Sequence, residues 1–152
     1  MAPRQQALQE QEKQVTGYLL DTHIWIWVQQ RNAGELTAKA FSLVENWQRL
    51  GQAFVSAISI LEIARLVADG QLDVPSTVDQ FIVDATIDGG LQLLPLSPRI
   101  LIESTRLPGA IHRDPADRLL AATAREHSLT LVTRDKDLLA YGKKGHLNVL
   151  KL

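Results

Sequence analysis

The sequence contains no cysteine among its 152 residues. This absence excludes disulfide bonds, zinc sites built on thiolates, iron–sulfur clusters and a cysteine nucleophile. Long hydrophobic runs are also missing, because no apolar stretch approaches the roughly 18–20 residues that are needed to span a bilayer. We therefore predict a chain that makes no use of a membrane and that belongs in the cytoplasm.

A surplus of charge of one sign is missing as well, since 16 Lys and Arg residues against 17 Asp and Glu residues give a net charge of −1. A strongly basic surface for coating nucleic acid is therefore excluded. The charge is nevertheless uneven: residues 1–98 hold 6 basic and 11 acidic residues (−5), whereas residues 99–152 hold 10 basic and 6 acidic residues (+4). The second part can attract a polyanion, although scattered surface charge explains the same counts.

The remaining composition, 45% apolar and 22% charged, is typical of a globular domain. Residues 1–16 are polar and lack the apolar core of a signal peptide, so we expect an N-terminal extension that is disordered or partly helical. From Gly17 onward short apolar runs appear, the first of them at residues 17–21. Residues 17–152 are therefore predicted to form a single folded domain.

Short apolar runs that alternate with helical patterns determine the expected fold class. The strands are predicted at residues 17–21, 53–56, 91–96, 129–133 and 148–152. The helices between them include those expected over residues 59–69, 78–88 and 98–108. Because parallel strands require crossover helices, this alternation predicts an α/β fold with three layers, α/β/α, around a mainly parallel central sheet.

Acidic residues follow the predicted strands at the sheet edge where ligands bind in open α/β folds. Asp21 ends the first strand, Glu62 lies in the first turn of the helix after the second strand, and Asp135 follows the fourth strand. Asp114 and Asp117 open a helix of the same series. Carboxylates gathered at one edge repel one another, so either their pKa values rise or a cation lies among them. Mg²⁺ or Mn²⁺ suits such an oxygen-only site and can promote attack of water on a phosphodiester.

Each acid also has a purely structural explanation, which leaves two alternatives open. Asp21, Asp114 and Asp135 stand where a helix needs an N-cap, and Ser59 with Glu62 has the spacing of a capping box. A non-catalytic binding module, in which the acids only cap helices, is one alternative. The other is a phosphoryl-transfer or receiver-like domain with Asp21 as the phosphate acceptor. No Walker phosphate loop, Gly-x-Ser-x-Gly elbow or His-Glu-x-x-His motif offers a further competitor.

The helix predicted over residues 22–30 is apolar on nearly every side and therefore needs cover on more than one face. Trp25 and Trp27 lie two positions apart, which separates their directions by about 200° on a helix. Either a second protein surface covers one of them, or the sheet and a neighbouring helix cover both.

Four segments carry the acidic residues in a recognisable order. They read Leu19-Leu-Asp-Thr-His-Ile-Trp25, Ser56-Ala-Ile-Ser-Ile-Leu-Glu62, His112-Arg-Asp-Pro-Ala-Asp117 and Leu131-Val-Thr-Arg-Asp135-Lys-Asp137. Together they resemble the motifs of PIN-domain proteins, in particular the VapC-type ribonuclease toxins of bacterial type II toxin–antitoxin pairs. The resemblance runs from about Gly17 to Leu152, so it implies a PIN-like nuclease domain at 17–152.

The resemblance implies an acidic catalytic site formed by Asp21, Glu62, Asp117 and Asp135. Asp21 and Asp117 would be the firmest metal ligands, with Asp135 binding the ion directly or through water. Glu62 would hold a water bound to the ion, or a second ion.

Other residues of the matched motifs would support this site. Thr22 and Thr133 would orient carboxylates by hydrogen bonds. Asp114 would serve as a cap, a ligand or a support to a ligand. Possible phosphate contacts are Arg113, Arg118 and Arg134.

The resemblance also implies the biology. It predicts a metal-dependent endoribonuclease that hydrolyses RNA phosphodiester bonds with Mg²⁺ or Mn²⁺ and acts as the toxin of a toxin–antitoxin system. The implied partners are the RNA substrate, a cognate antitoxin protein and a second copy of the chain in a homodimer.

Overall fold

The computed structural model describes residues 17–111 and 113–152, so the predicted extension at 1–16 and His112 lie outside the described residues. Its centre is one sheet of five short strands: β1 (Tyr18–Leu20), β2 (Ala53–Ser56), β3 (Gln92–Leu94), β4 (Thr130–Val132) and β5 (Val149–Leu150). The strand order is β3-β2-β1-β4-β5, and all four pairings are parallel. The predicted α/β class with a parallel central sheet is confirmed.

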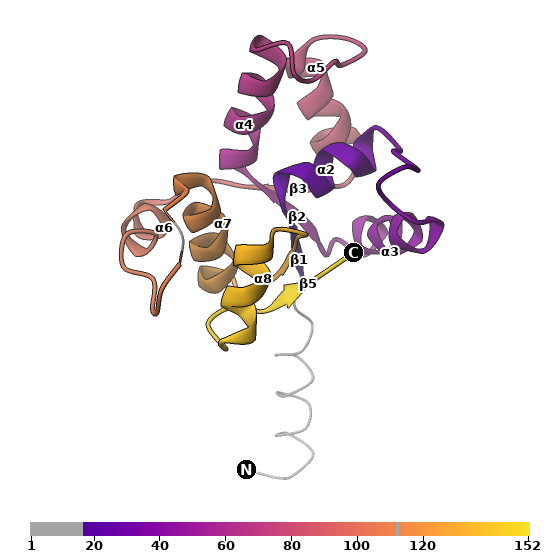
Figure 1. Cartoon of the computed structure of the whole chain (residues 1–152). Helices are drawn as coiled ribbons and strands as arrows, with labels where there is room; N and C mark the ends of the chain where they lie inside the picture. Colours follow the sequence, from indigo (N-terminus) through magenta and orange to yellow (C-terminus); the bar gives the residue numbers. More distant parts are fainter. Residues whose placement is uncertain (1–16, 112) are drawn as a thin grey trace.

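Helices connect the strands and cover the sheet (Figure 1). They are α2 (Thr22–Gln29), α3 (Ala38–Arg49), α4 (Ala57–Ala68), α5 (Val78–Val83), the π-helix η1 (Asp84–Asp88), α6 (Pro98–Glu103), α7 (Pro115–Glu126) and α8 (Lys136–Lys143). Within the described part of the chain, none of these helices is long and apolar enough to cross a membrane.

Two hydrophobic cores lie on opposite faces of the sheet. Consecutive strand residues point to opposite faces, so Leu20 belongs to the core beneath α2, α3 and α5, whereas Leu19 belongs to the core beneath α6, α7 and α8. Helix α4 contributes to both cores, through Ile63 to the first and Ile58 to the second. This arrangement gives the three layers that the sequence predicts.

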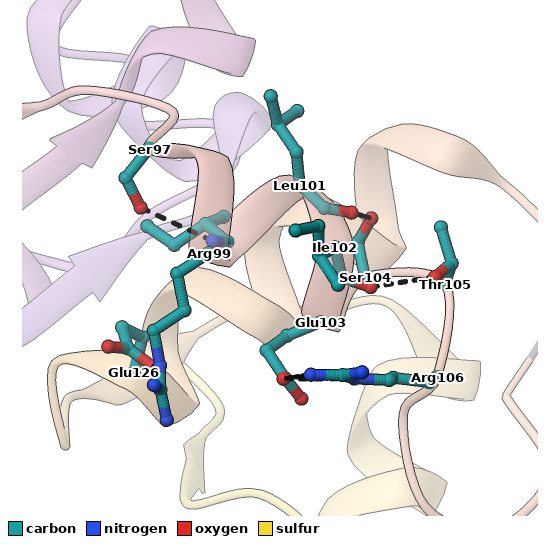
Figure 2. A network of polar contacts seen from close by, with 10 residues as sticks. Ser97, Arg99, Leu101, Ile102, Glu103, Ser104, Thr105, Arg106 and Glu126 are labelled. Carbon is teal, nitrogen blue, oxygen red and sulfur yellow. Dashed lines mark hydrogen bonds and ion pairs between the residues drawn. The ribbon is translucent and has the colours of Figure 1, made fainter.

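Two predicted helices end differently in the structure. The helix expected over 78–88 is an α-helix to Val83 and a π-helix thereafter, where the hydroxyl of Thr86 donates to the carbonyl of Ile82 at 2.7 Å. The helix expected over 98–108 ends at Glu103. The hydroxyls of Ser104 and Thr105 donate to backbone carbonyls three residues earlier, at 2.6 and 2.7 Å (Figure 2). Such side-chain bonds compete with continuation of a helix.

The strand order places a crevice at the carboxyl ends of β1 and β4. Within the sheet, β2 and β3 lie on one side of β1, and β4 and β5 lie on its other side. The connections leave the sheet in opposite directions at such a switch point, so side chains that follow β1 and β4 face an open edge where ligands bind.

Candidate active site

A cavity of about 300 Å³ lies at this edge of the sheet. All four acids predicted from the sequence contribute to its wall, together with Asp114. The residues that line it are Asp21, His23, Ile24, Trp27, Glu62, Asp114, Asp117, Arg134 and Asp135. The fold thus brings side chains from four distant segments to one place.

Asp21 connects the first strand to the first helix of the cavity. It is the N-cap of α2, and its Oδ1 accepts a hydrogen bond from the N–H of Thr22 at 2.7 Å. Its Oδ2 accepts from the hydroxyl of Thr133 at 2.7 Å, across the switch point. Burial nevertheless raises the pKa of Asp21 above its ordinary value, because the desolvation of the charged form outweighs these bonds. Negative charge at this position is therefore costly without a cation.

Glu62 stands one turn further along its helix than the sequence predicted. Helix α4 begins at Ala57 and is capped by Ser56, whose hydroxyl accepts from the N–H of Ile58 at 3.1 Å. The predicted capping box of Ser59 and Glu62 is therefore wrong, because β2 runs straight into α4 and a residue earlier in the chain takes the cap. Glu62 consequently lies in the second turn and lines the cavity.

Buried hydroxyls hold Glu62 in place. The hydroxyl of Thr22 donates to Glu62 Oε1 at 2.6 Å and lies 2.7 Å from the hydroxyl of Ser59. Because Thr22 has a single hydroxyl hydrogen and gives it to Glu62, Ser59 is the donor of the second bond. Burial raises the pKa of Glu62, and the nearby carboxylate of Asp21 raises it further. The two acids thus share one hydrogen-bonded support through Thr22.

Two of the remaining acids cap helices, as the structural alternative expected. Asp114 is the N-cap of α7 and accepts from the N–H groups of Ala116 at 2.9 Å and Asp117 at 3.4 Å. Asp135 is the N-cap of α8 and accepts from two N–H groups at 2.9 Å. Asp117 lies in the first turn of α7 behind its cap. Helices α2, α7 and α8 therefore all begin at the cavity. The dipoles of these helices favour negative charge at their N-termini.

The hydroxyl of Thr133 links the two sides of the switch point. It donates to Asp21 and accepts from the backbone N–H of Asp135 at 3.0 Å. Both Thr22 and Thr133 are almost completely buried, at 1% and 0% exposure. Each hydroxyl donates to one carboxylate, Thr22 to Glu62 and Thr133 to Asp21, as the resemblance implied.

The acids do not form a ready-made metal site. Within residues 17–111 and 113–152, no three His, Cys, Asp or Glu side chains are grouped closely enough to hold an ion as they stand. The donor set of the cavity is nonetheless dominated by carboxylate oxygen, the chemistry that hard divalent cations prefer.

Part of the cavity wall is aromatic and cationic. The guanidinium of Arg134 lies over the ring of Trp27, 5.0 Å from its centroid, and pairs with Glu35 through Nη1 and Oε2 at 3.2 Å. Sequence reasoning named Arg134 but assigned no role to Trp27 in the site. Of the other candidate phosphate contacts, Arg113 and Arg118 are absent from the described residues that line the cavity.

The two tryptophans of α2 have different surroundings. Trp25 is fully buried in the core, and its indole N–H donates to the side-chain oxygen Oε1 of Gln29 at 2.7 Å. Trp27 is half-buried beside the cavity. Trp25 therefore faces the core next to the sheet, and Trp27 faces the cavity. Both tryptophans have their surroundings within this chain.

The comparison with known families agrees with this geometry. The sequence profile of the PIN domain matches residues 18–144, from β1 to the C-cap of α8. The chain belongs to the PIN-domain family. The acid-lined cavity is therefore at the switch point of a PIN domain.

Known PIN-domain relatives and solved structures resemble the chain over nearly its whole length. Ribonuclease VapC22 of Mycobacterium tuberculosis is 29% identical over 127 residues, which cover 84% of this chain and 93% of that protein. VapBC2 from Rickettsia felis, bound to a DNA fragment from its promoter, superposes with a TM-score of 0.63 at 18% identity, covering 89% of this chain and 98% of that one.

A third likeness is to FitAcB from Neisseria gonorrhoeae, with a TM-score of 0.61 at 20% identity, covering 88% of this chain and 96% of that one. At these identities the structural likenesses establish that the PIN fold is shared.

Proposed function

We propose that this PIN-domain protein is a metal-dependent endoribonuclease that acts as the toxin of a toxin–antitoxin pair. The observation that carries the proposal is the convergence of Asp21, Glu62, Asp117 and Asp135 on one cavity at the switch point of a PIN fold. The likeness to a ribonuclease, VapC22, supports RNA as the substrate. Membership of the PIN family also favours this activity over a receiver-like phosphate acceptor.

The charge of the cavity supports a requirement for a divalent cation. Its wall carries five carboxylates and one guanidinium, a net charge of −4 when all are ionised. An RNA phosphate is repelled by such a wall. Asp21, Asp117 and Asp135 would hold Mg²⁺ or Mn²⁺, and the ion would have to draw these side chains together, since they are not grouped as a ready-made site.

The residues of the chain have distinct roles in the proposed hydrolysis. A divalent cation supplies Lewis-acid stabilisation of the charge that builds on the phosphate during in-line attack by water. Glu62 is fixed through Oε1 by Thr22, and its raised pKa suits it to accept a proton from the attacking water. Thr133 holds the carboxylate of Asp21 through its hydroxyl, which also accepts from the backbone N–H of Asp135. As the P–O bond breaks, the leaving oxygen of the RNA chain takes up a proton from solvent water, and Glu62 later releases its proton to solvent.

The partners follow from the proposed class. The solved complexes of VapB with VapC and of FitA with FitB pair toxin-like chains of this fold with an antitoxin, so we propose an antitoxin protein that covers the cavity of this chain. We also propose a homodimer and a cytoplasmic location, where RNA is available.

The direct test uses the purified chain and single-stranded RNA. With Mn²⁺ or Mg²⁺ present we expect cleavage into defined fragments, and an excess of EDTA should reduce the rate about 1,000-fold, because several kcal/mol of charge stabilisation are lost. Cleavage is measured on end-labelled RNA by gel electrophoresis. Cleavage that persists undiminished in EDTA would contradict the proposed mechanism.

Thr22 provides a second prediction, because it supports two of the acids at once. Thr22→Val removes the hydroxyl that donates to Glu62 and should lower the cleavage rate about 10- to 100-fold, the usual effect of losing a residue that supports a ligand. Thr22→Ser keeps the hydroxyl and should retain most of the rate. Initial rates at saturating Mn²⁺ test this. Equal rates for the Val and Ser variants would show that the hydroxyl is irrelevant.

A further inference from the structure

We propose that Trp27 and Arg134 form a nucleobase-binding subsite, in which a base of single-stranded RNA stacks on the guanidinium that lies over the Trp27 ring. The subsite rests on the proposed ribonuclease function, and it deepens that function by assigning where the base beside the scissile phosphate is bound. The four acids account for phosphate chemistry, but Trp27 and Arg134, which line the same cavity, have no role in it.

The helical register directs Trp27 to the cavity. His23 and Trp27 are four residues apart on α2 and thus share one face, with ring centroids 5.8 Å apart. Both residues line the cavity, whereas Trp25, on the other side of the helix, is buried in the core. The Trp27 ring packs against the edge of the first core and also lines the cavity, so it provides a supported aromatic surface there.

The guanidinium of Arg134 is held in a fixed position. Its Nε donates to the carbonyl of Leu152 at 2.8 Å, Nη1 pairs with Glu35 Oε2 at 3.2 Å, and Nη2 donates to the carbonyl of Glu35. Its position over Trp27 adds a cation–π contact. The side chain keeps 31% of its surface exposed and lines the cavity. The guanidinium of Arg134 is therefore a plane that is held in position, and part of the side chain remains accessible from the cavity.

A base fits this plane better than a phosphate does. The positive charge of Arg134 is already paired with Glu35 and faces the cavity carboxylates, which weakens its attraction for an anion. Stacking depends on the plane and its polarisability, and unpaired bases stack on guanidinium planes and aromatic rings in protein–RNA complexes. Because the acids and this plane share one cavity, a base bound there belongs to a nucleotide adjacent to the phosphate at the acids.

The test compares intact and abasic RNA. A short single-stranded oligonucleotide with one mapped cleavage site is made in versions that lack one base at a time around that site. For the wild-type chain we expect kcat/KM to fall roughly 10-fold or more for an abasic nucleotide at one position, in line with the usual strength of stacking. In Trp27→Leu and Arg134→Lys this abasic penalty should nearly vanish, since the first removes the supporting ring and the second keeps the charge but loses the plane. Arg99→Lys, which changes a guanidinium that pairs with Glu126 outside the cavity wall, is the matched control and should keep the full penalty.

A binding measurement separates this proposal from the cleavage activity. The same labelled oligonucleotides are titrated in Ca²⁺, another hard cation with oxygen ligands, by fluorescence anisotropy. If RNA is cleaved but both variants keep the abasic penalty, the subsite is wrong and the ribonuclease function stands. If no RNA is cleaved but the abasic penalty in binding disappears in both variants, the subsite stands and the ribonuclease function is wrong. A weaker salt dependence of binding in Arg134→Gln, which removes the charge, together with an unchanged abasic penalty in Arg134→Lys would indicate a phosphate contact and overturn base stacking.

Discussion

Asp21→Asn is expected to abolish RNA cleavage, with a fall in rate of about 1,000-fold or more, while the chain remains folded. The carboxylate of Asp21 is held at both oxygens, by bonds from Thr22 and Thr133. Asn keeps the shape and can accept one of these bonds, but it carries no charge to hold a divalent ion. Losing several kcal/mol of electrostatic stabilisation corresponds to this change in rate.

The control for this result is a matched change away from the cavity. Asp69→Asn replaces an exposed acid at the end of α4 and should leave the rate unchanged. Rates are measured on the same RNA at saturating Mn²⁺, and circular dichroism verifies the fold. If Asp21→Asn cleaves RNA as fast as the wild type, Asp21 is not part of the catalytic site.

The second large effect concerns stability with and without the metal. Because burial raises the pKa of Asp21, its ionised carboxylate destabilises the metal-free chain, so Asp21→Asn should have a higher free energy of unfolding at pH 7 without metal. Mn²⁺ at 100 times its dissociation constant should then stabilise the wild type by about 2.7 kcal/mol, and Asp21→Asn much less. Urea unfolding with EDTA and with Mn²⁺ measures both changes. A wild type that gains nothing from Mn²⁺ would contradict the metal site.

The pH dependence of this effect has a definite sign. In the folded chain Asp21 holds its proton to a higher pH than its ordinary value of 3.8 allows in the unfolded chain. The contribution of Asp21 to the stability of the metal-free chain is therefore fully present at or below this ordinary value and is lost as the pH rises through the raised pKa. Glu62 changes the stability in the same direction, since its pKa is also raised. Asp21→Asn should show a smaller loss over this range.

Local patterns were sufficient for several parts of the fold and the site. The apolar runs predicted all five strands, and a strand that ends in an acid placed Asp21 at the sheet edge before any contact was known. The N-caps at Asp21, Asp114 and Asp135 were also readable, because a cap depends on the chemistry of a few neighbouring residues. The caps and the cavity wall are made by the same residues, so the structural explanation and the site are not exclusive.

Other features depended on contacts that local patterns do not contain. The box assigned to Ser59 and Glu62 has correct spacing, yet Ser56 caps α4 because the strand runs directly into the helix. Ser59 instead bonds to Thr22, which is 37 positions away in the chain. Spacing predicts a cap only when the helix boundary is known, and the strand register sets that boundary.

The amino-acid order by itself determined the α/β alternation, the family motifs and the acids at the strand ends, because each follows from periodicity or from neighbours in the chain. Only the tertiary structure decided that Trp27 and Arg134, which are 107 positions apart, share a cavity with those acids. The physical reason is that the strand order brings the ends of β1 and β4 together, and contacts across that junction have no counterpart in local sequence.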